Sequence, residues 1–95
     1  MTTEYLNILN TAISVFGVDN QLNVAIEEMS ELTKEICKTK RGFHNDKEVA
    51  DEIADVYIML EQLKLIYHND IAVKERIAFK VSRLNSRIEN YKKGL

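Results

Sequence analysis

Two short acidic motifs, separated by twenty residues, have the composition and spacing of a metal site. The first contains Glu28 and Glu31, and the second contains Glu52 and Asp55. Acids three positions apart project from one side of a helix, because three residues make nearly one helical turn. Two carboxylates about 4 Å apart repel by roughly 4 kcal/mol at an effective dielectric near 20, so four acids facing one space favour a bound cation. Oxygen ligands of this kind suit Mg²⁺ better than Zn²⁺.

The second motif places an acid where an apolar side chain is expected. At about 100° per residue, Glu52 projects into the apolar stripe of its helix, and Asp55 lies at the border of that stripe. The stripe around Glu52 is formed by Val49, Val56 and Leu60. Burying an ionised acid without a partner costs several kcal/mol, so this carboxylate needs a proton, a basic side chain or a metal ion to neutralise it.

The same projection places the acids of the earlier helix beside its core face. Glu28, Glu31 and Glu35 fall together on one border of an apolar arc centred near Met29. Glu27 lies further round, towards solvent. The plain alternative is that both acid pairs belong to solvated helix surfaces, where acids three apart are common.

Hydrophobic periodicity predicts four helices to carry these residues. No proline and only three glycines interrupt the chain, which favours long helices. Thr2 or Thr3 is expected to cap the first helix, Gly17 to end it, and Asp19 or Asn20 to cap the second. The predicted fold is an all-α four-helix bundle forming one domain over residues 1–95. Its helices cover residues 3–16, 21–39, 45–68 and 71–92.

A basic row follows one border of the last predicted helix. Its spacing of four, three and four residues aligns the side chains beside the apolar stripe, where they could bind the phosphates of a metal-bound nucleotide. A solvated face, or salt bridges to Glu75 and Glu89, would explain the row equally well. The row consists of Arg76, Lys80, Arg83 and Arg87.

Composition narrows the possible classes of protein. Apolar residues make up 45% of the chain and charged residues 29%, a balance that excludes a disordered chain. The net charge of −2 argues against a dedicated nucleic-acid binder. A chain of 95 residues buries only about 60–65% of its unfolded surface, so we expect stability to be shared with another subunit. The short apolar runs and the absence of a secretion signal predict a cytoplasmic protein without membrane contact.

The remaining candidates for chemistry have simpler interpretations. His44 and His68 fall at helix ends, where exposed or capping roles are expected rather than metal ligation. Cys37 cannot form an internal disulfide, which fits a reducing cytosol, and we expect it in the core. The aromatic residues at helical spacing are expected in the core or a subunit interface, and they are Tyr57, Tyr67, Phe79 and Tyr91.

The compound acidic motif resembles that of the MazG-like, all-α nucleoside triphosphate pyrophosphohydrolases. That family carries Glu-x-x-Glu, a gap of a dozen to nearly thirty residues, and then Glu-x-x-Asp. This chain reads Glu28-Met-Ser-Glu31, twenty residues, and Glu52-Ile-Ala-Asp55. The resemblance is strong over residues 21–63 and extends to the rest only as a pattern of helices.

The resemblance implies an enzyme that hydrolyses a nucleoside triphosphate, with Mg²⁺ as cofactor, to the monophosphate and pyrophosphate. The Mg²⁺ ligands it implies are Glu28, Glu31, Glu52 and Asp55. Basic groups on the last helix would meet the phosphates, with Lys80 and Arg83 matching the family's Asn-x-Lys-x-x-Arg run, Arg76 preceding it, and Ala78 standing in place of the Asn. The candidates for catalytic proton transfer are Glu27, Glu28, Glu31 and Glu35.

Assembly and substrate complete the expectations. We expect a homodimer or homotetramer that completes each pocket between helices. Phosphoribosyl-ATP is a possible alternative substrate, since the pyrophosphohydrolase that acts on it shares the bundle and the acids. A non-catalytic helical interaction module is the alternative outside enzymes.

Overall fold

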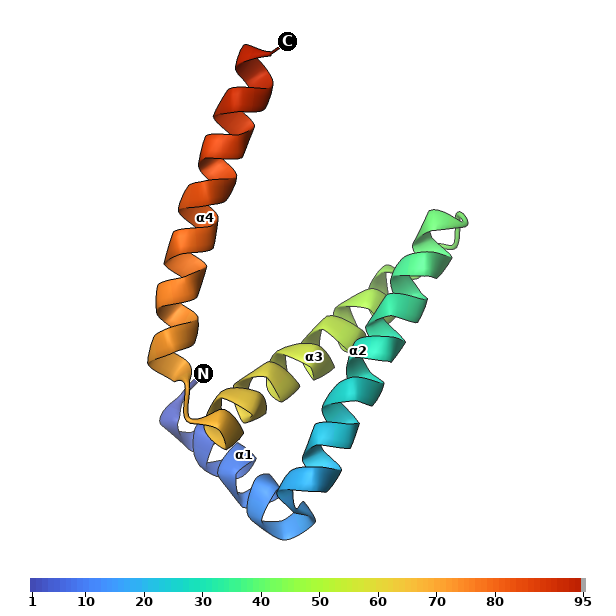
Figure 1. The fold of residues 1–95 in the computed structure, drawn as a ribbon. Coiled ribbons are helices and arrows are strands. Elements are labelled where there is room, and N and C mark those ends of the chain that lie inside the picture. Colours follow the sequence, from blue (N-terminus) through green and yellow to red (C-terminus); the bar gives the residue numbers. More distant parts are fainter. Residues whose placement is uncertain (95) are drawn as a thin grey trace.

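The computed structural model describes residues 1–94, and helices are the only regular secondary structure in this part of the chain (Figure 1). This confirms the predicted all-α class and the number of helices. The helices are α1 (Thr3–Phe16), α2 (Val18–Lys40), α3 (Asp46–Tyr67) and α4 (Asp70–Lys93).

The helix ends follow the predicted signals with one correction. Thr2 caps α1, because its Oγ1 accepts a hydrogen bond from the backbone N–H of Tyr5 at 3.1 Å. Gly17 ends α1 as predicted, with φ 88° and ψ 150°. The same glycine is also the N-cap of α2, so the prediction of Asp19 or Asn20 as that cap is wrong. The left-handed glycine turns the chain within a single residue, and α2 therefore starts three positions earlier than expected.

The α2–α3 hairpin is the centre of the fold. The two helices run antiparallel, and α1 packs across both of them at the end away from the connecting loop (Figure 1). The buried apolar residues within residues 1–94 are Leu9, Ala25 and Met59, one from each of these three helices. This core is small, and it holds the facing sides of α2 and α3 in a fixed register.

The last helix extends away from the other three (Figure 1). Within α4, all of which the structure describes, no residue is buried, and its tertiary contacts are with α3 alone. Lys64 and Lys74 both pair with Asp70, at 3.0 and 3.2 Å, beside the left-handed His68 that ends α3. A single chain thus packs three helices together, and the predicted bundle of four is only partly formed within it.

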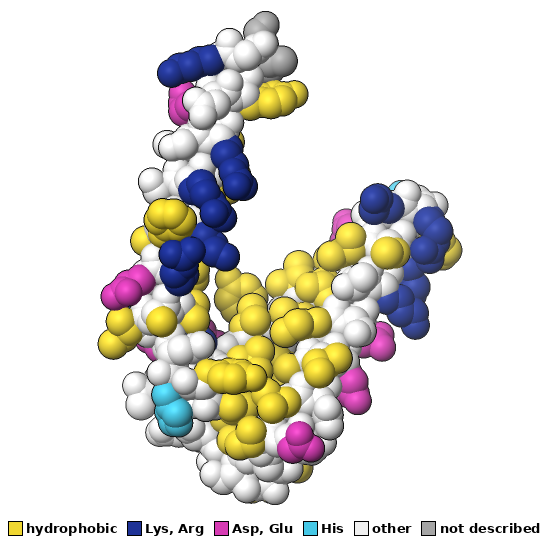
Figure 2. All heavy atoms as spheres, in the orientation of Figure 1, with side chains coloured by type: hydrophobic (Ala, Val, Ile, Leu, Met, Phe, Trp, Pro, Cys, Tyr) yellow, Lys and Arg dark blue, Asp and Glu magenta, His cyan; other side chains and the backbone are white. Residues whose placement is uncertain are grey.

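Much of the predicted apolar core is exposed in the single chain. Figure 2 shows an open hollow with hydrophobic side chains on its floor, bounded on one side by α4. Cys37 is exposed, so the prediction that it is a core residue is wrong. The four aromatic residues predicted for the core or a subunit interface are also exposed, so they are not core residues of the single chain. No helix within residues 1–94 combines the length and the apolar character needed to cross a membrane.

Candidate metal site

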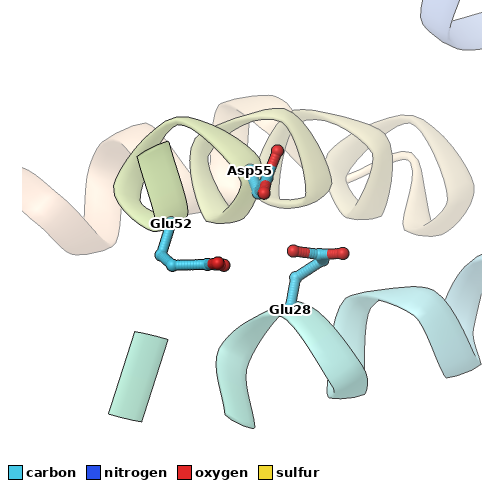
Figure 3. Close-up of side chains that lie close together, drawn as sticks. All are labelled: Glu28, Glu52 and Asp55. Carbon is cyan, nitrogen blue, oxygen red and sulfur yellow. The ribbon is translucent and has the colours of Figure 1, made fainter. Parts of the chain in front are cut away.

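The structure brings three of the four predicted ligands together between α2 and α3. Glu28 comes from α2, while Glu52 and Asp55 lie one turn apart on α3 (Figure 3). One carboxylate oxygen from each residue lies within 4.8 Å of the other two. All three side chains are half-buried, since they occupy the border between the helix interface and solvent. We call this set, Glu28, Glu52 and Asp55, the acid cluster.

Glu52 carries the least satisfied charge of the acid cluster. Its Oε2 atom is buried and has no hydrogen-bond partner among the described residues. Burial, followed by the charge of Asp55 and then that of Glu31, raises the pKa of Glu52 above its ordinary value. This confirms the prediction that Glu52 projects into the apolar stripe, and it identifies the carboxylate that would gain most from a cation.

The pKa of Glu28 is also raised, by burial first and then by the charge of Asp55. The charges of Glu52 and Glu31 contribute in the same direction. Acids on two helices therefore repel one another across one small space. A divalent cation placed there would attract each of these carboxylates and offset their mutual repulsion.

Glu31, the fourth predicted ligand, is exposed and lies outside the acid cluster. It is one turn from Glu28, near enough for its charge to affect the pKa of both Glu28 and Glu52. Glu27 is exposed as predicted and is likewise outside the cluster. The geometry therefore supports Glu28, Glu52 and Asp55 as direct ligands and places Glu31 next to them.

Glu35 serves a different purpose from the predicted catalytic one. Its Oε2 accepts a hydrogen bond from Asn45 Nδ2 at 2.7 Å, and its Oε1 accepts one from Lys38 Nζ at 3.2 Å. The hydrogen bond from Asn45 is the main cause that lowers the pKa of Glu35. Both carboxylate oxygens are thus engaged, which makes Glu35 a poor proton acceptor and removes it from our catalytic candidates.

Asn45 is the residue at this site that the sequence interpretation missed. Its Nδ2 also donates to the backbone carbonyl of Glu35 at 3.0 Å, and its Oδ1 accepts from Thr39 Oγ1 at 2.9 Å. It is buried and immediately precedes α3. Asn45 is the N-cap residue of α3, but its side chain makes no capping hydrogen bond and instead joins the start of α3 to α2. The only signal in the sequence was a polar residue at the end of the loop.

The basic row lies on α4, away from the acid cluster within one chain. Figure 2 shows Lys and Arg side chains of α4 facing the hollow. The guanidinium groups of Arg76 and Arg83 lie 4.7 and 5.6 Å from the centroid of the Phe79 ring. In the described part of the chain no residue of the row forms an ion pair, so the salt bridges to Glu75 and Glu89 considered above are not formed.

His44 is exposed and His68 ends α3, in agreement with their predicted positions at helix ends.

Comparison with known proteins adds no family: the chain matches no family model, no curated protein and no solved structure.

Proposed function

We propose that the protein is a cytoplasmic, Mg²⁺-dependent nucleotide pyrophosphohydrolase that splits the α–β phosphoanhydride of nucleoside triphosphates. The observation that carries the proposal is the acid cluster, and above all the buried, unpartnered Oε2 of Glu52. An arrangement of this kind is costly unless a cation completes it. The compound acidic motif, with its resemblance to the MazG-like enzymes, supplies the reaction.

The donor set fits a hard divalent ion. Glu28, Glu52 and Asp55 offer only oxygen atoms, with Glu31 one turn away as a fourth carboxylate. When bound, Mg²⁺ would neutralise the triphosphate and lower the pKa of a bound water. Three acids at the edge of the helix interface can hold such an ion while leaving one side open to substrate.

Side chains of the protein itself would accept the proton and bind the phosphates. Glu31, which is exposed and lies one turn from Glu28 outside the acid cluster, is the best placed proton acceptor, with the exposed Glu27 as a second candidate. Lys80, Arg83 and Arg76 would bind the phosphates through charge-assisted hydrogen bonds and stabilise charge that builds up during cleavage. Because α4 extends away from the acid cluster, we expect this contribution in a homodimer or homotetramer.

The test is a pyrophosphate assay on the purified chain with Mg²⁺ and a panel of ribonucleoside and deoxyribonucleoside triphosphates. We expect release of pyrophosphate and monophosphate, and a decrease of at least about 100-fold in Glu52→Gln. The matched control is Glu48→Gln, an exposed acid in the first turn of the same helix. If the wild-type protein releases no more pyrophosphate from any triphosphate than the Glu52→Gln variant does, the proposal fails.

Two further outcomes of the same assay have definite meanings. Cleavage of phosphoribosyl-ATP alone would assign the acid cluster to that substrate. Absence of activity on every substrate, combined with no change of melting temperature in Mg²⁺, would favour a helical interaction module, which the large exposed apolar surface also suits. A ligand at 100 times its dissociation constant should stabilise the protein by about 2.7 kcal/mol.

A further inference from the structure

A set of hydrogen bonds joins α2 to α3 at the loop end of the hairpin. Asn45, the N-cap of α3, donates from Nδ2 to the Oε2 atom and to the backbone carbonyl of Glu35, at 2.7 and 3.0 Å. Its Oδ1 accepts a hydrogen bond from Thr39 Oγ1 at 2.9 Å. Asn45 and Glu35 are only 7% and 9% exposed. We call Glu35, Thr39 and Asn45 the clamp, because one buried amide side chain binds α2 at three points.

The clamp lies on the same faces of the two helices as the acid cluster. Glu35 follows Glu28 by seven residues, and Asn45 precedes Glu52 by seven. Seven residues make nearly two helical turns and change the direction of a side chain by only about 20°. Because α2 and α3 run antiparallel, both intervals extend from the acid cluster towards the loop (Figure 1). The clamp therefore lies about 10 Å from the acid cluster along the helix axes.

Within residues 1–94, Glu35 and Asn45 are the only buried residues of the hairpin on the loop side of the acid cluster. The other buried residues of α2 and α3 lie on the opposite side of the cluster, towards α1. They are Gln21, Ala25, Met59 and Gln62. If the clamp is released, α3 can therefore rotate at its loop end while the rest of the hairpin stays packed.

A small rotation of α3 would separate the proposed ligands. A carboxylate about 6 Å from a helix axis moves by about 2 Å when the helix turns by about 20°. Mg²⁺ requires oxygen atoms at about 2.1 Å in nearly octahedral geometry, so a displacement of this size removes a ligand. The mutual repulsion of the three acids favours any movement that separates them in the metal-free protein. The clamp opposes such a movement.

The chemistry of Asn45 suits this position. Its amide binds one oxygen of Glu35 without adding a charge, while Lys38 Nζ donates to the other oxygen, Oε1, at 3.2 Å. A basic side chain in place of Asn45 could also bind Glu35, but it would add a positive charge near the acids that we expect to hold a cation. An amide has both a donor and an acceptor, so it binds a carboxylate and a hydroxyl at the same time.

We propose that Asn45 is a positioning residue of the metal site, which holds α3 at the rotation that brings its two acids opposite Glu28. Its three hydrogen bonds all go to α2, so it acts through the orientation of α3 and not by contact with a ligand. This role rests on the metal site of the proposed function, but not on the reaction that occurs there. Loss of the clamp should weaken the binding of a divalent ion more than loss of a comparable stabilising contact elsewhere.

The test is a titration of the full chain with Mn²⁺ in the absence of nucleotide, in which electron paramagnetic resonance counts the free ion. Circular dichroism establishes that each variant is folded at the temperature used. Asn45→Ala removes all three hydrogen bonds and should raise the dissociation constant at least about tenfold. Glu35→Ala and Glu35→Gln lose the same charge, but only the glutamine keeps an oxygen that can accept a hydrogen bond from Asn45. Glu35→Ala should therefore bind Mn²⁺ at least about tenfold more weakly than Glu35→Gln.

Leu9→Ala is the control that separates positioning from stability. It removes a buried apolar side chain of α1 and should lower the melting temperature, as Asn45→Ala does, without touching the clamp. Its affinity for Mn²⁺ should remain that of the wild type. Equal weakening in Leu9→Ala and Asn45→Ala would show that the clamp only stabilises the fold, and would overturn the proposal.

Three other results would also overturn the positioning role. They are a folded Asn45→Ala protein that binds Mn²⁺ like the wild type, equal affinities of the two Glu35 variants, and a wild type that leaves Mn²⁺ free. Should Asn45→Ala fail to fold, the comparison of the two Glu35 variants decides.

The pyrophosphate assay separates this role from the proposed reaction. Binding of Mn²⁺ that depends on the clamp, without release of pyrophosphate from any triphosphate, would support the positioning role and refute the pyrophosphohydrolase. Release of pyrophosphate by a protein whose affinity for Mn²⁺ does not depend on Asn45 would do the reverse.

Discussion

At the residue scale, the position of Glu52 connects stability to the proposed metal binding. Its carboxylate is held in an apolar stripe, with one oxygen buried and unpartnered and two other acids within a few ångströms. Such a residue destabilises the empty protein and gains most when a cation is bound. The same feature that weakens the metal-free fold would therefore favour a bound cation.

Replacing Glu52 by Gln should raise the melting temperature of the metal-free protein by a few degrees at neutral pH. The amide removes a half-buried charge and its repulsion by Asp55 and Glu31, the causes that raise the pKa of Glu52. The same change should abolish stabilisation by Mg²⁺. Thermal melts with and without Mg²⁺ measure both effects. The melting temperature of the control variant, Glu48→Gln, should not rise in this way. A Glu52→Gln protein that is less stable than the wild type without metal would contradict this account.

The hydrogen bonds of Asn45 should appear in the pH dependence of stability. The folded-state pKa of Glu35 is lowered from 4.5, so its contribution is complete above that pH and is lost as pH falls through the lowered pKa. Asn45→Ala should lower the melting temperature by several degrees at neutral pH, and the gap should narrow below about pH 4.5. Melts between acidic and neutral pH measure the gap. For Asn23→Ala, at an exposed position, the difference in melting temperature from the wild type should not change with pH. If the difference for Asn45→Ala is also constant with pH, the role of Glu35 is refuted.

These two residues also show how far a sequence predicts a site. The projection of Glu52 into the apolar stripe follows from helical periodicity alone, because the stripe and the acid belong to one helix. The pairing of Glu35 with Asn45 does not, because it depends on how the loop between α2 and α3 returns the chain. Which acids face each other across two helices depends on their relative rotation, and this is why Glu31 was expected inside the acid cluster.

At the element scale, one glycine joins two helices. Gly17 ends α1 and caps α2 at φ 88° and ψ 150°, backbone angles that other residues rarely adopt. No atom within 4 Å would obstruct an added Cβ, so the requirement is conformational. The class and approximate limits of the helices were predictable because they depend on local periodicity and caps. The second role of Gly17, as the N-cap of α2, was not predictable, since the local sequence marks this glycine only as the end of α1.

Gly17→Ala should therefore destabilise the protein by about 1–3 kcal/mol. Gly94→Ala is the matched control, because Gly94 has right-handed helical angles and its Cβ would meet only ordinary contacts, so its effect should stay within about 0.5 kcal/mol. Urea unfolding monitored by circular dichroism gives both values. Equal effects at the two positions would show that the turn does not require a glycine.

The fourth helix should be the least protected element whenever chains are separated. It has no buried residue, whereas α2 and α3 share the core and the Asn45 hydrogen bonds. In dilute protein, amides of Asp70–Lys93 should exchange with deuterium faster than those of α2 and α3. Hydrogen exchange read by mass spectrometry resolves the segments. Equal protection of all four helices would contradict the sparse packing of α4 in the chain.

At the scale of the whole molecule, the shape departs from that of a compact domain. The radius of gyration is 16.9 Å, compared with about 12 Å for a compact chain of this length. The sequence predicted that stability would be shared between subunits, because a short chain buries too little surface. The direction in which α4 extends was not predictable, because its apolar stripe could pack against a helix of the same chain or against a helix of a second chain.

The whole-molecule arrangement also explains why one chain separates the two halves of the predicted site. The acid cluster lies on the packed hairpin, and the basic row lies on a helix that extends from it. Under the proposed function, phosphate binding by the basic row would require a second chain to bring these bases to the acid cluster. The acid cluster nevertheless belongs to one chain, and its affinity for a cation can be measured separately.

The most direct test of the account is a titration of the chain with Mn²⁺, which favours the same oxygen ligands as Mg²⁺ and whose free form is counted by electron paramagnetic resonance. We predict one bound Mn²⁺ per chain in the wild type and in Glu48→Gln, displaced by excess Mg²⁺, and loss of this binding in Glu52→Gln. A wild-type protein that leaves Mn²⁺ free, or a Glu52→Gln variant that binds it equally well, would contradict the central claim that Glu28, Glu52 and Asp55 form a metal site.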